Sequence, residues 1–239
     1  MKVETVEYDY GGVTLVGELA HDETASGSRP GILVVHEGSG LTPHARRRAR
    51  ELAGQGYVAF ACDMYGGASL AKDMAESRQK LGALRADLDT LRGRVRAGLE
   101  VLRAQPGVDP QRIAAIGFCF GGLCVLELAR SGADVAAVVS FHGILSTERP
   151  ARAGEVKAKV LACHGSADPF VPPEQVAAFQ KELTDAGVDW HFLTLGGAGH
   201  GFTNVDAGAL GVPGVAYDAK AEQRSFASMR DFLGSLFKG

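Results

Sequence analysis

One stretch, residues 113–122, constrains the fold of this chain more than any other; it reads Ile-Ala-Ala-Ile-Gly-Phe-Cys-Phe-Gly-Gly. Its first part is apolar and leans toward β structure, and a helical pattern follows at once over residues 123–130. Between them lies Gly-x-Cys-x-Gly, which predicts a tight turn with Cys119 at its tip. A strained turn of this kind needs small residues two positions before and two after the tip, and Gly117 and Gly121 meet that need. The stretch therefore predicts a strand, a sharp turn carrying a thiol, and a helix.

Strands and helices alternate through most of the remaining chain. Two alternating segments around Gly11-Gly12 predict an antiparallel hairpin at one edge of a sheet, over residues 3–8 and 13–20. Short apolar runs predict further strands at residues 31–35, 57–62, 112–118, 135–141, 159–163 and 191–195. Periodic apolar positions predict helices at about residues 44–53, 81–104, 123–130, 173–186 and 217–237. This order predicts an α/β fold with a mostly parallel central sheet covered by helices on both faces, as a single domain over residues 1–239 without a lid domain.

Composition and charge exclude several classes of protein. The formal net charge is −3, and the longest basic run, residues 46–48, falls in a helical pattern, so we interpret it as a solvated helix face. No apolar run approaches the roughly 18 residues that a membrane-spanning helix needs. The four cysteines are too few for a disulfide framework in a chain this long, and Cys62, Cys124 and Cys163 are assigned to packing. We therefore expect a reduced, cytoplasmic protein that binds neither nucleic acid nor membrane.

Four polar residues directly follow predicted strands: Glu37, Cys119, Asp168 and His200. In parallel sheets, ligands bind beyond the carboxyl ends of the strands, so these side chains are expected at one edge of the sheet. The order nucleophile, acid, histidine is the order that α/β-hydrolases use, and residues 117–122 match the turn called the nucleophile elbow in that fold, with cysteine in place of the usual serine. Together these residues predict nucleophilic catalysis by a thiolate.

These motifs resemble the dienelactone hydrolase family of the α/β-hydrolase superfamily, from about Gly31 to the C-terminal helix. The resemblance is carried by Glu37 and by three segments, residues 117–122, 164–169 and 199–202. It implies a cofactor-free hydrolase of small esters or lactones that works through a thioester. In the roles it implies, Cys119 is the nucleophile, His200 the base, Asp168 the acid that orients His200, and Glu37 the carboxylate that takes the proton of the resting thiol. The backbone N–H groups of Gly38 and Phe120 are the implied oxyanion donors.

The sequence departs from the family where its name-giving members hold the carboxylate of a dienelactone with two arginines. One arginine precedes the elbow strand, where Arg78 is a loose match and Arg85 competes for the role. The other follows the catalytic histidine by four residues, where this chain has Asn204. An amide does not replace a bidentate guanidinium, so we expect an ester or lactone other than dienelactone itself. The candidate substrate-binding residues are Arg78, Arg85, Phe202 and Asn204.

We expect a hydrolase that acts as a monomer or homodimer, and three other interpretations compete with it. A ligand-binding or regulatory protein on a hydrolase scaffold would explain the fold, but not the complete set of catalytic residue types. A thiol redox protein would use Cys119 and Cys124, whose spacing is not that of a C-x-x-C motif. The third interpretation is a metal site, whose candidate ligands are His36, His142, Cys163 and His164. The chain lacks the paired cysteine motifs and the H-E-x-x-H helix that are typical of such sites. We expect no metal and no cofactor.

Overall fold

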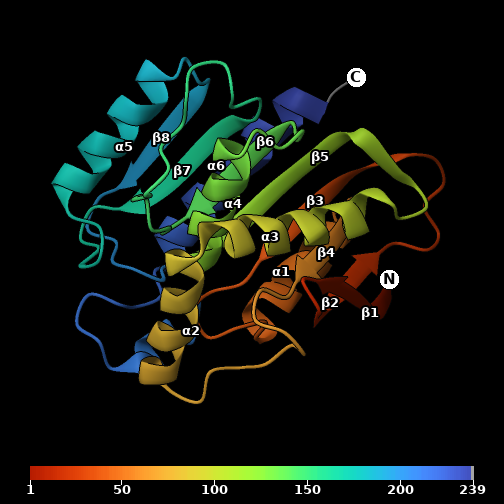
Figure 1. Ribbon diagram of the computed structural model, residues 1–239, viewed down its shortest axis with the longest axis horizontal. Coiled ribbons are helices and arrows are strands. Elements are labelled where there is room, and N and C mark those ends of the chain that lie inside the picture. Colours follow the sequence, from red (N-terminus) through yellow and green to blue (C-terminus); the bar gives the residue numbers. More distant parts are fainter. Residues whose placement is uncertain (238–239) are drawn as a thin grey trace. The chain divides into compact units, whose positions relative to one another are not determined.

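The computed structural model describes residues 1–237, and Figure 1 shows its strands and helices. Eight strands and six α-helices alternate along this part of the chain, together with one short 3₁₀ helix. The strands form an eight-stranded, mostly parallel sheet, so the predicted α/β fold is confirmed. Contacts along the chain divide it into two compact units, residues 1–116 and 117–239. The prediction that the chain forms a single domain stays a prediction.

The first unit begins with the predicted antiparallel hairpin. Strands β1 (Lys2–Tyr10) and β2 (Val13–His21) pair along their whole length, from Lys2 opposite His21 to Tyr10 opposite Val13. Strands β3 (Arg29–Val35) and β4 (Val58–Cys62) are parallel to each other, and β2 joins β4 antiparallel. The interior of β3 and all of β4 are buried, as continuous apolar runs predict.

Three helices belong to the first unit: α1 (Pro43–Ala53), α2 (Met74–Ala86) and α3 (Leu88–Arg103). The prediction of one helix over residues 81–104 is wrong, because Asp87 leaves the helical conformation with φ −121° and ψ 80°. Its carboxylate accepts hydrogen bonds from the backbone N–H and the hydroxyl of Thr90, and so caps the start of α3. The leucine spacing runs in phase across the break, so periodicity alone did not reveal it. Figure 1 shows α3 crossing in front of the strands that it covers.

The second unit continues the alternation from the end of β5 (Val108–Phe118). Its strands β6 (Ala137–Phe141), β7 (Lys159–Gly165) and β8 (Trp190–Leu195) pair parallel in that order. Its helices are α4 (Phe120–Arg130), α5 (Pro173–Asp185) and α6 (Ala219–Phe237), and the 3₁₀ helix η1 spans Ala207–Leu210.

Helices α5 and α6 cover opposite faces of β8. Successive residues of a strand point to opposite faces, and the rings of His191 and Phe192 follow that rule. His191 packs against Phe232 of α6, with ring centroids 5.6 Å apart, and Phe192 packs against Phe179 of α5 at 6.2 Å. The prediction of a sheet covered on both faces is therefore confirmed at this strand.

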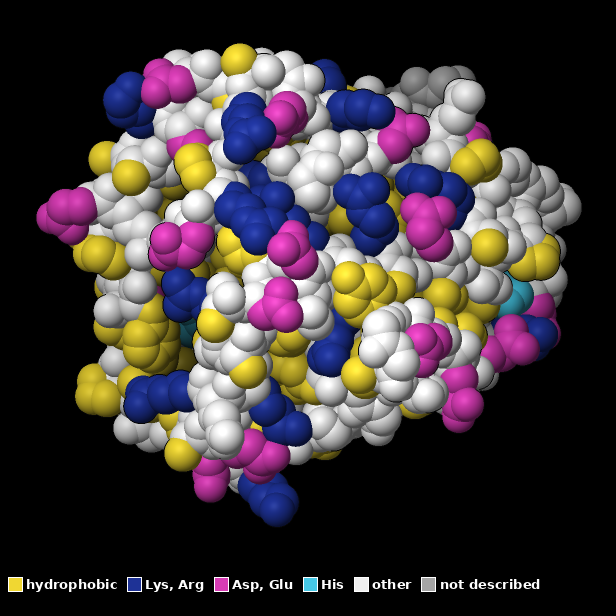
Figure 2. Space-filling view, in the orientation of Figure 1, with side chains coloured by type: hydrophobic (Ala, Val, Ile, Leu, Met, Phe, Trp, Pro, Cys, Tyr) yellow, Lys and Arg dark blue, Asp and Glu magenta, His cyan; other side chains and the backbone are white. Residues whose placement is uncertain are grey.

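Charged side chains are mixed on the surface. On the face shown in Figure 2, Lys and Arg side chains lie interspersed with Asp and Glu over most of the view. Among the described residues, no helix is both long and apolar enough to cross a membrane.

Candidate active site

Cys119 occupies the tip of the turn between β5 and α4, as predicted. Its φ of 52° and ψ of −112° are unusual for a residue with a side chain, and such a conformation costs about 1–3 kcal/mol. The Cys119 backbone N–H donates a hydrogen bond of 3.0 Å to the carbonyl of Phe141 at the end of β6. Cys119 is partly exposed, whereas Cys62, Cys124 and Cys163 are buried. The turn thus carries a partly exposed cysteine on a strained backbone.

The glycines around Cys119 let backbone segments approach closely. A Cβ atom on Gly117 would lie 2.0 Å from the carbonyl oxygen of Gly121. One on Gly122 would lie 2.6 Å from Oγ of Ser140 and 2.7 Å from Cα of Gly143. Real Cβ atoms essentially never come within 3.0 Å of such neighbours. The predicted requirement for glycine at position 117 is therefore confirmed, because any side chain there would clash with the backbone of Gly121.

Asp168 and His200 meet through their side chains, although 32 residues separate them. Nδ1 of His200 lies 2.8 Å from Oδ2 of Asp168, and both side chains are buried. The other carboxylate oxygen of Asp168 accepts a 2.9 Å hydrogen bond from the backbone N–H of Phe170. Because a carboxylate only accepts, Nδ1 of His200 carries the proton in this contact. Because Nδ1 is held by Asp168, Nε2 is the ring atom of His200 that exchanges a proton with another group.

Backbone contacts fix the loops that carry these two residues. The N–H of Ala167 donates to the carbonyl of Ala198, and the N–H of His200 donates to the carbonyl of Gly214, at 2.9 and 2.8 Å. A Cβ on Gly165 would lie 2.4 Å from the Ala198 oxygen, and one on Gly199 would lie 2.1 Å from the Gly214 oxygen. The two loops therefore touch through their main chains, which glycine makes possible.

His200 also interacts with Cys119. Burial by itself lowers the pKa of His200, but the negative charge of the Cys119 thiolate and hydrogen bonds to Asp168 and Cys119 outweigh it and raise that pKa to about 10. An imidazole with such a pKa keeps its proton at neutral pH, so His200 is an imidazolium beside the sulfur of Cys119. Cys119, His200 and Asp168 thus form a continuous chain of side-chain contacts within the second unit.

Two residues beside His200 were not among the predicted site residues. The ring of His142 packs edge-on against His200, with centroids 5.2 Å apart, and its Nε2 lies 2.8 Å from Oγ1 of Thr203. The ring of Phe170 packs against the imidazole of His200 at 4.9 Å and is 43% exposed. The sequence places His142 directly after the predicted strand over residues 135–141. That position indicated a candidate metal ligand, but not a contact with His200. Among the described residues, no group of three or more His, Cys, Asp or Glu side chains is arranged to hold a metal ion.

The predicted residues Glu37 and Gly38 lie in the first unit, in the segment after β3. Nδ1 of His44 is 3.6 Å from a carboxylate oxygen of Glu37. Nε2 of His36 accepts a hydrogen bond from the N–H of Met64, so its Nδ1 carries the proton and donates to the carbonyl of Glu37 at 2.6 Å. Burial lowers the pKa of His36, in keeping with this neutral form. His36 therefore holds the backbone at Glu37 in a defined conformation.

The remaining predicted residues differ in their surroundings. Arg78 and Arg85 lie on α2 and are exposed. Phe202 is fully buried, with its ring centroid 4.9 Å from that of His142. The side-chain oxygen of Asn204 accepts a hydrogen bond from the N–H of Asp206. Phe120 is the first residue of α4, where backbone N–H groups have no acceptor within the helix.

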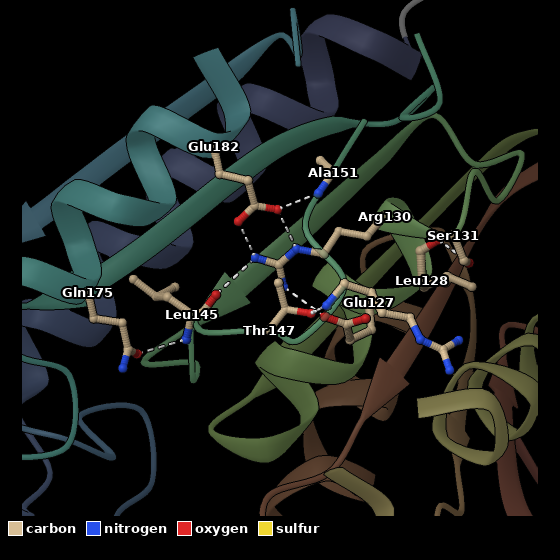
Figure 3. A network of polar contacts seen from close by, with 10 residues as sticks. Glu127, Leu128, Arg130, Ser131, Leu145, Thr147, Ala151, Gln175 and Glu182 are labelled. Atoms are coloured by element: carbon tan, nitrogen blue, oxygen red, sulfur yellow. Dashed lines mark hydrogen bonds and ion pairs between the residues drawn. The ribbon is translucent and has the colours of Figure 1, made fainter. Parts of the chain in front are cut away.

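A buried ion-pair network fixes the far end of the elbow helix (Figure 3). The guanidinium of Arg130, the last residue of α4, donates to Glu127 at 2.9 Å and to both carboxylate oxygens of Glu182 on α5 at 2.8 Å. It also donates to the carbonyl of Leu145, while Glu182 accepts from the N–H of Ala151. The network joins α4, α5 and the segment between β6 and β7.

Comparison with known proteins identifies the family of this chain. The family model described as the dienelactone hydrolase family matches residues 16–237. A solved structure named m3DLH is 44% identical, covers 99% of both chains and has a TM-score of 0.95. A dienelactone hydrolase-like promiscuous phosphotriesterase from metagenomic libraries is also 44% identical, with 98% of both chains covered and a TM-score of 0.93. A putative carboxymethylenebutenolidase of Salmonella typhimurium is 28% identical over 77% of this chain and 71% of its own. The chain therefore belongs to the dienelactone hydrolase family and is a hydrolase of esters or lactones.

Proposed function

We propose that this enzyme hydrolyses small, uncharged esters or lactones through a thioester formed on Cys119. The observation that carries the proposal is the continuous contact from Asp168 through His200 to Cys119 at a positive-φ turn. A thiolate is a far stronger nucleophile than a thiol, and the positive charge of the neighbouring imidazolium of His200 pairs with it.

In the proposed first step, the sulfur of Cys119 attacks the carbonyl carbon of the substrate and the carbonyl electron pair moves onto oxygen. The N–H of Phe120, and on the family resemblance that of Gly38, would stabilise this oxyanion, each by about 3–4 kcal/mol. When the C–O bond breaks, the leaving oxygen takes the proton from Nε2 of His200. The products of this step are an alcohol, a thioester and a neutral imidazole.

In the proposed second step, a water molecule attacks the thioester while Nε2 of His200 takes one of its protons. The C–S bond then breaks, which releases the carboxylic acid and restores the thiolate beside the imidazolium. Asp168 keeps its hydrogen bond to Nδ1 throughout, so that only Nε2 exchanges protons. For Glu37 we propose the role implied by the family: before the first step its carboxylate takes the proton of the resting thiol, which leaves the thiolate beside the imidazolium of His200.

An uncharged substrate is proposed because Asn204 stands where the name-giving members of the family have an arginine. Its side-chain oxygen already accepts the N–H of Asp206, which supports a role in the turn. Arg78, Arg85, Phe202 and Asn204 stay proposed substrate contacts. The exposed ring of Phe170 beside His200 adds an apolar surface near the leaving group.

The test is a burst experiment with p-nitrophenyl acetate. Wild-type enzyme is expected to release about one equivalent of nitrophenol rapidly and then to turn over, and prior treatment with iodoacetamide is expected to abolish both phases. Cys119→Ala is expected to show neither phase, whereas the matched control Cys124→Ala, at a buried position of α4, keeps both. Full turnover by Cys119→Ala would refute the proposal, and stoichiometric binding without turnover by wild type would favour a ligand-binding protein.

Phosphotriester hydrolysis is a second candidate activity. It is supported by the 44% identity to the promiscuous phosphotriesterase described above. The Cys119 thiolate would attack phosphorus in place of a carbonyl carbon and expel the best leaving group, and water would then release the phosphodiester. Repeated turnover of a nitrophenyl dialkyl phosphate that Cys119→Ala lacks is the expected result; a single equivalent released followed by permanent inactivation would count against it.

A further inference from the structure

His142 has a conformation that its own residue type disfavours. Its φ is 39°, in the left-handed region, and its side chain is fully buried. A non-glycine residue held there costs about 1–3 kcal/mol, so surrounding contacts must hold it in place. One such contact is the 2.8 Å hydrogen bond from the His142 backbone N–H to the carbonyl of Cys163 on β7. The fold thus holds a buried histidine in strain directly after β6.

The ring of His142 contacts the segment that carries the proposed base. Its Nε2 lies 2.8 Å from Oγ1 of Thr203, three residues after His200, and both groups are buried. Its edge-on contacts with the rings of His200 and Phe202 have centroid distances of 5.2 and 4.9 Å. A single side chain therefore contacts three of the four residues 200–203.

Phe141, the residue before His142, contacts the backbone of the proposed nucleophile Cys119. The carbonyl of Phe141 accepts the backbone N–H of Cys119 at 3.0 Å. Two consecutive residues thus contact the backbone of the nucleophile and the ring of the base. Because a misplacement of about 1 Å between reacting groups can cost about 10²-fold in rate, such a connection has a direct catalytic consequence.

We propose that His142, through its hydrogen bond to Thr203, is a positioning residue that holds His200 where it pairs with the Cys119 thiolate. The inference rests on the proposed function of Cys119 as nucleophile. Two other groups act on His200: Asp168 at Nδ1 and His164 of β7. Burial lowers the pKa of His164; the negative charge of Asp168 opposes this effect, and the positive charge of His200 adds to it. Neither of these groups is altered by changes at Thr203.

The test compares Thr203→Val, Thr203→Ser, His142→Phe and the Thr203→Val/His142→Phe double variant. Thr203→Val keeps the shape and removes the hydroxyl, whereas Thr203→Ser keeps the hydroxyl and serves as the matched control. The first readout is the rate of Cys119 alkylation by iodoacetamide between pH 5 and 9, which needs no turnover. The second is kcat and KM for p-nitrophenyl acetate.

Thr203→Val and His142→Phe are each expected to change the pH profile of Cys119 alkylation, because a displaced His200 no longer pairs with the sulfur of Cys119. Each is expected to lower kcat about tenfold or more with little change in KM, and the double variant is expected to be no worse than either single one, because both remove the same hydrogen bond. Thr203→Ser is expected to keep the wild-type profile.

A wild-type alkylation profile in folded Thr203→Val would overturn the proposal, as would additive losses in the double variant. Thr203→Val decides the question if His142→Phe fails to fold. Failure of the proposed function would look different, since wild-type turnover would then survive complete alkylation of Cys119.

Discussion

The carboxylate of Asp168 contacts the side chain of His200 with one oxygen and the backbone of Phe170 with the other, at 2.8 and 2.9 Å. We predict that Asp168→Asn lowers kcat/KM for p-nitrophenyl acetate by on the order of 10²–10⁴-fold with little loss of stability. An amide has the same shape, but its NH₂ group can donate to Nδ1 and so favour the tautomer with the proton on Nε2. Asp185→Asn, which changes an exposed carboxylate on α5, is the matched control. An Asp168→Asn enzyme within twofold of wild type would contradict the role of Asp168.

The raised pKa of His200 predicts a specific pH dependence. We expect the imidazole of His200 to titrate near pH 10 in NMR spectra of the wild type, and at lower pH in Cys119→Ala, because the thiolate charge is one cause of the increase. The folded pKa is above the value of about 6.5 in the unfolded chain, so the stability that this proton contributes is fully present below pH 6.5 and is lost as the pH rises through 10. Denaturation of wild type and His200→Gln at pH 7 and pH 10 tests the sign: the wild-type advantage must shrink at pH 10.

The close approach of Gly117 to Gly121 predicts a large effect of one methyl group. Gly117→Ala would place a Cβ 2.0 Å from a backbone oxygen that cannot move without distorting the start of α4. We expect a loss of about 1–3 kcal/mol or more in the free energy of unfolding, measured by urea denaturation. The control is Gly234→Ala in α6, where nothing lies within 4 Å of the added Cβ and a gain of about 0.5–1 kcal/mol is expected. Equal stabilities of the two variants would show that the turn is more adaptable than this geometry implies.

The ion-pair network at Arg130 predicts a stability effect at the end of the elbow helix. Arg130→Met would remove the guanidinium that the fully buried Glu127 and the mostly buried Glu182 share (Figure 3). Removing one member of a buried pair typically costs about 3–5 kcal/mol, and thermal and urea denaturation would measure it. Lys181→Met, which breaks an exposed pair with Asp185 on the same helix α5, should change stability by no more than about 0.5 kcal/mol. A small effect at Arg130 would mean that water reaches the carboxylates once the guanidinium is removed.

The elbow and its partners were predictable because their signals are local. Glycine spacing around Cys119 reflects backbone contacts within a few residues, and Asp168 and His200 each follow a buried strand in a parallel α/β order. Since parallel strands end at a common edge, the contact between Asp168 and His200 followed from chain order.

Features that depend on side-chain contacts between distant segments were not predictable. His142 and Thr203 are 61 residues apart, and neither residue type in isolation indicates the hydrogen bond between them. The break at Asp87 was missed for a different reason, because an N-cap is a weaker signal than a leucine spacing that continues in phase on both sides. The roles of Glu37 and Gly38, the monomeric or homodimeric state and the cytoplasmic location stay predictions.

At position 119, the residue that would give the most stable fold differs from the residue that the proposed chemistry needs. A φ of 52° suits glycine better than any residue with a side chain, so the fold alone would favour glycine at this position. A Cys119→Gly chain would relieve the strain and should unfold at higher denaturant concentration while doing no hydrolysis. The enzyme therefore gives up part of its stability for a thiol, and a selection for thermal resistance alone would remove the nucleophile.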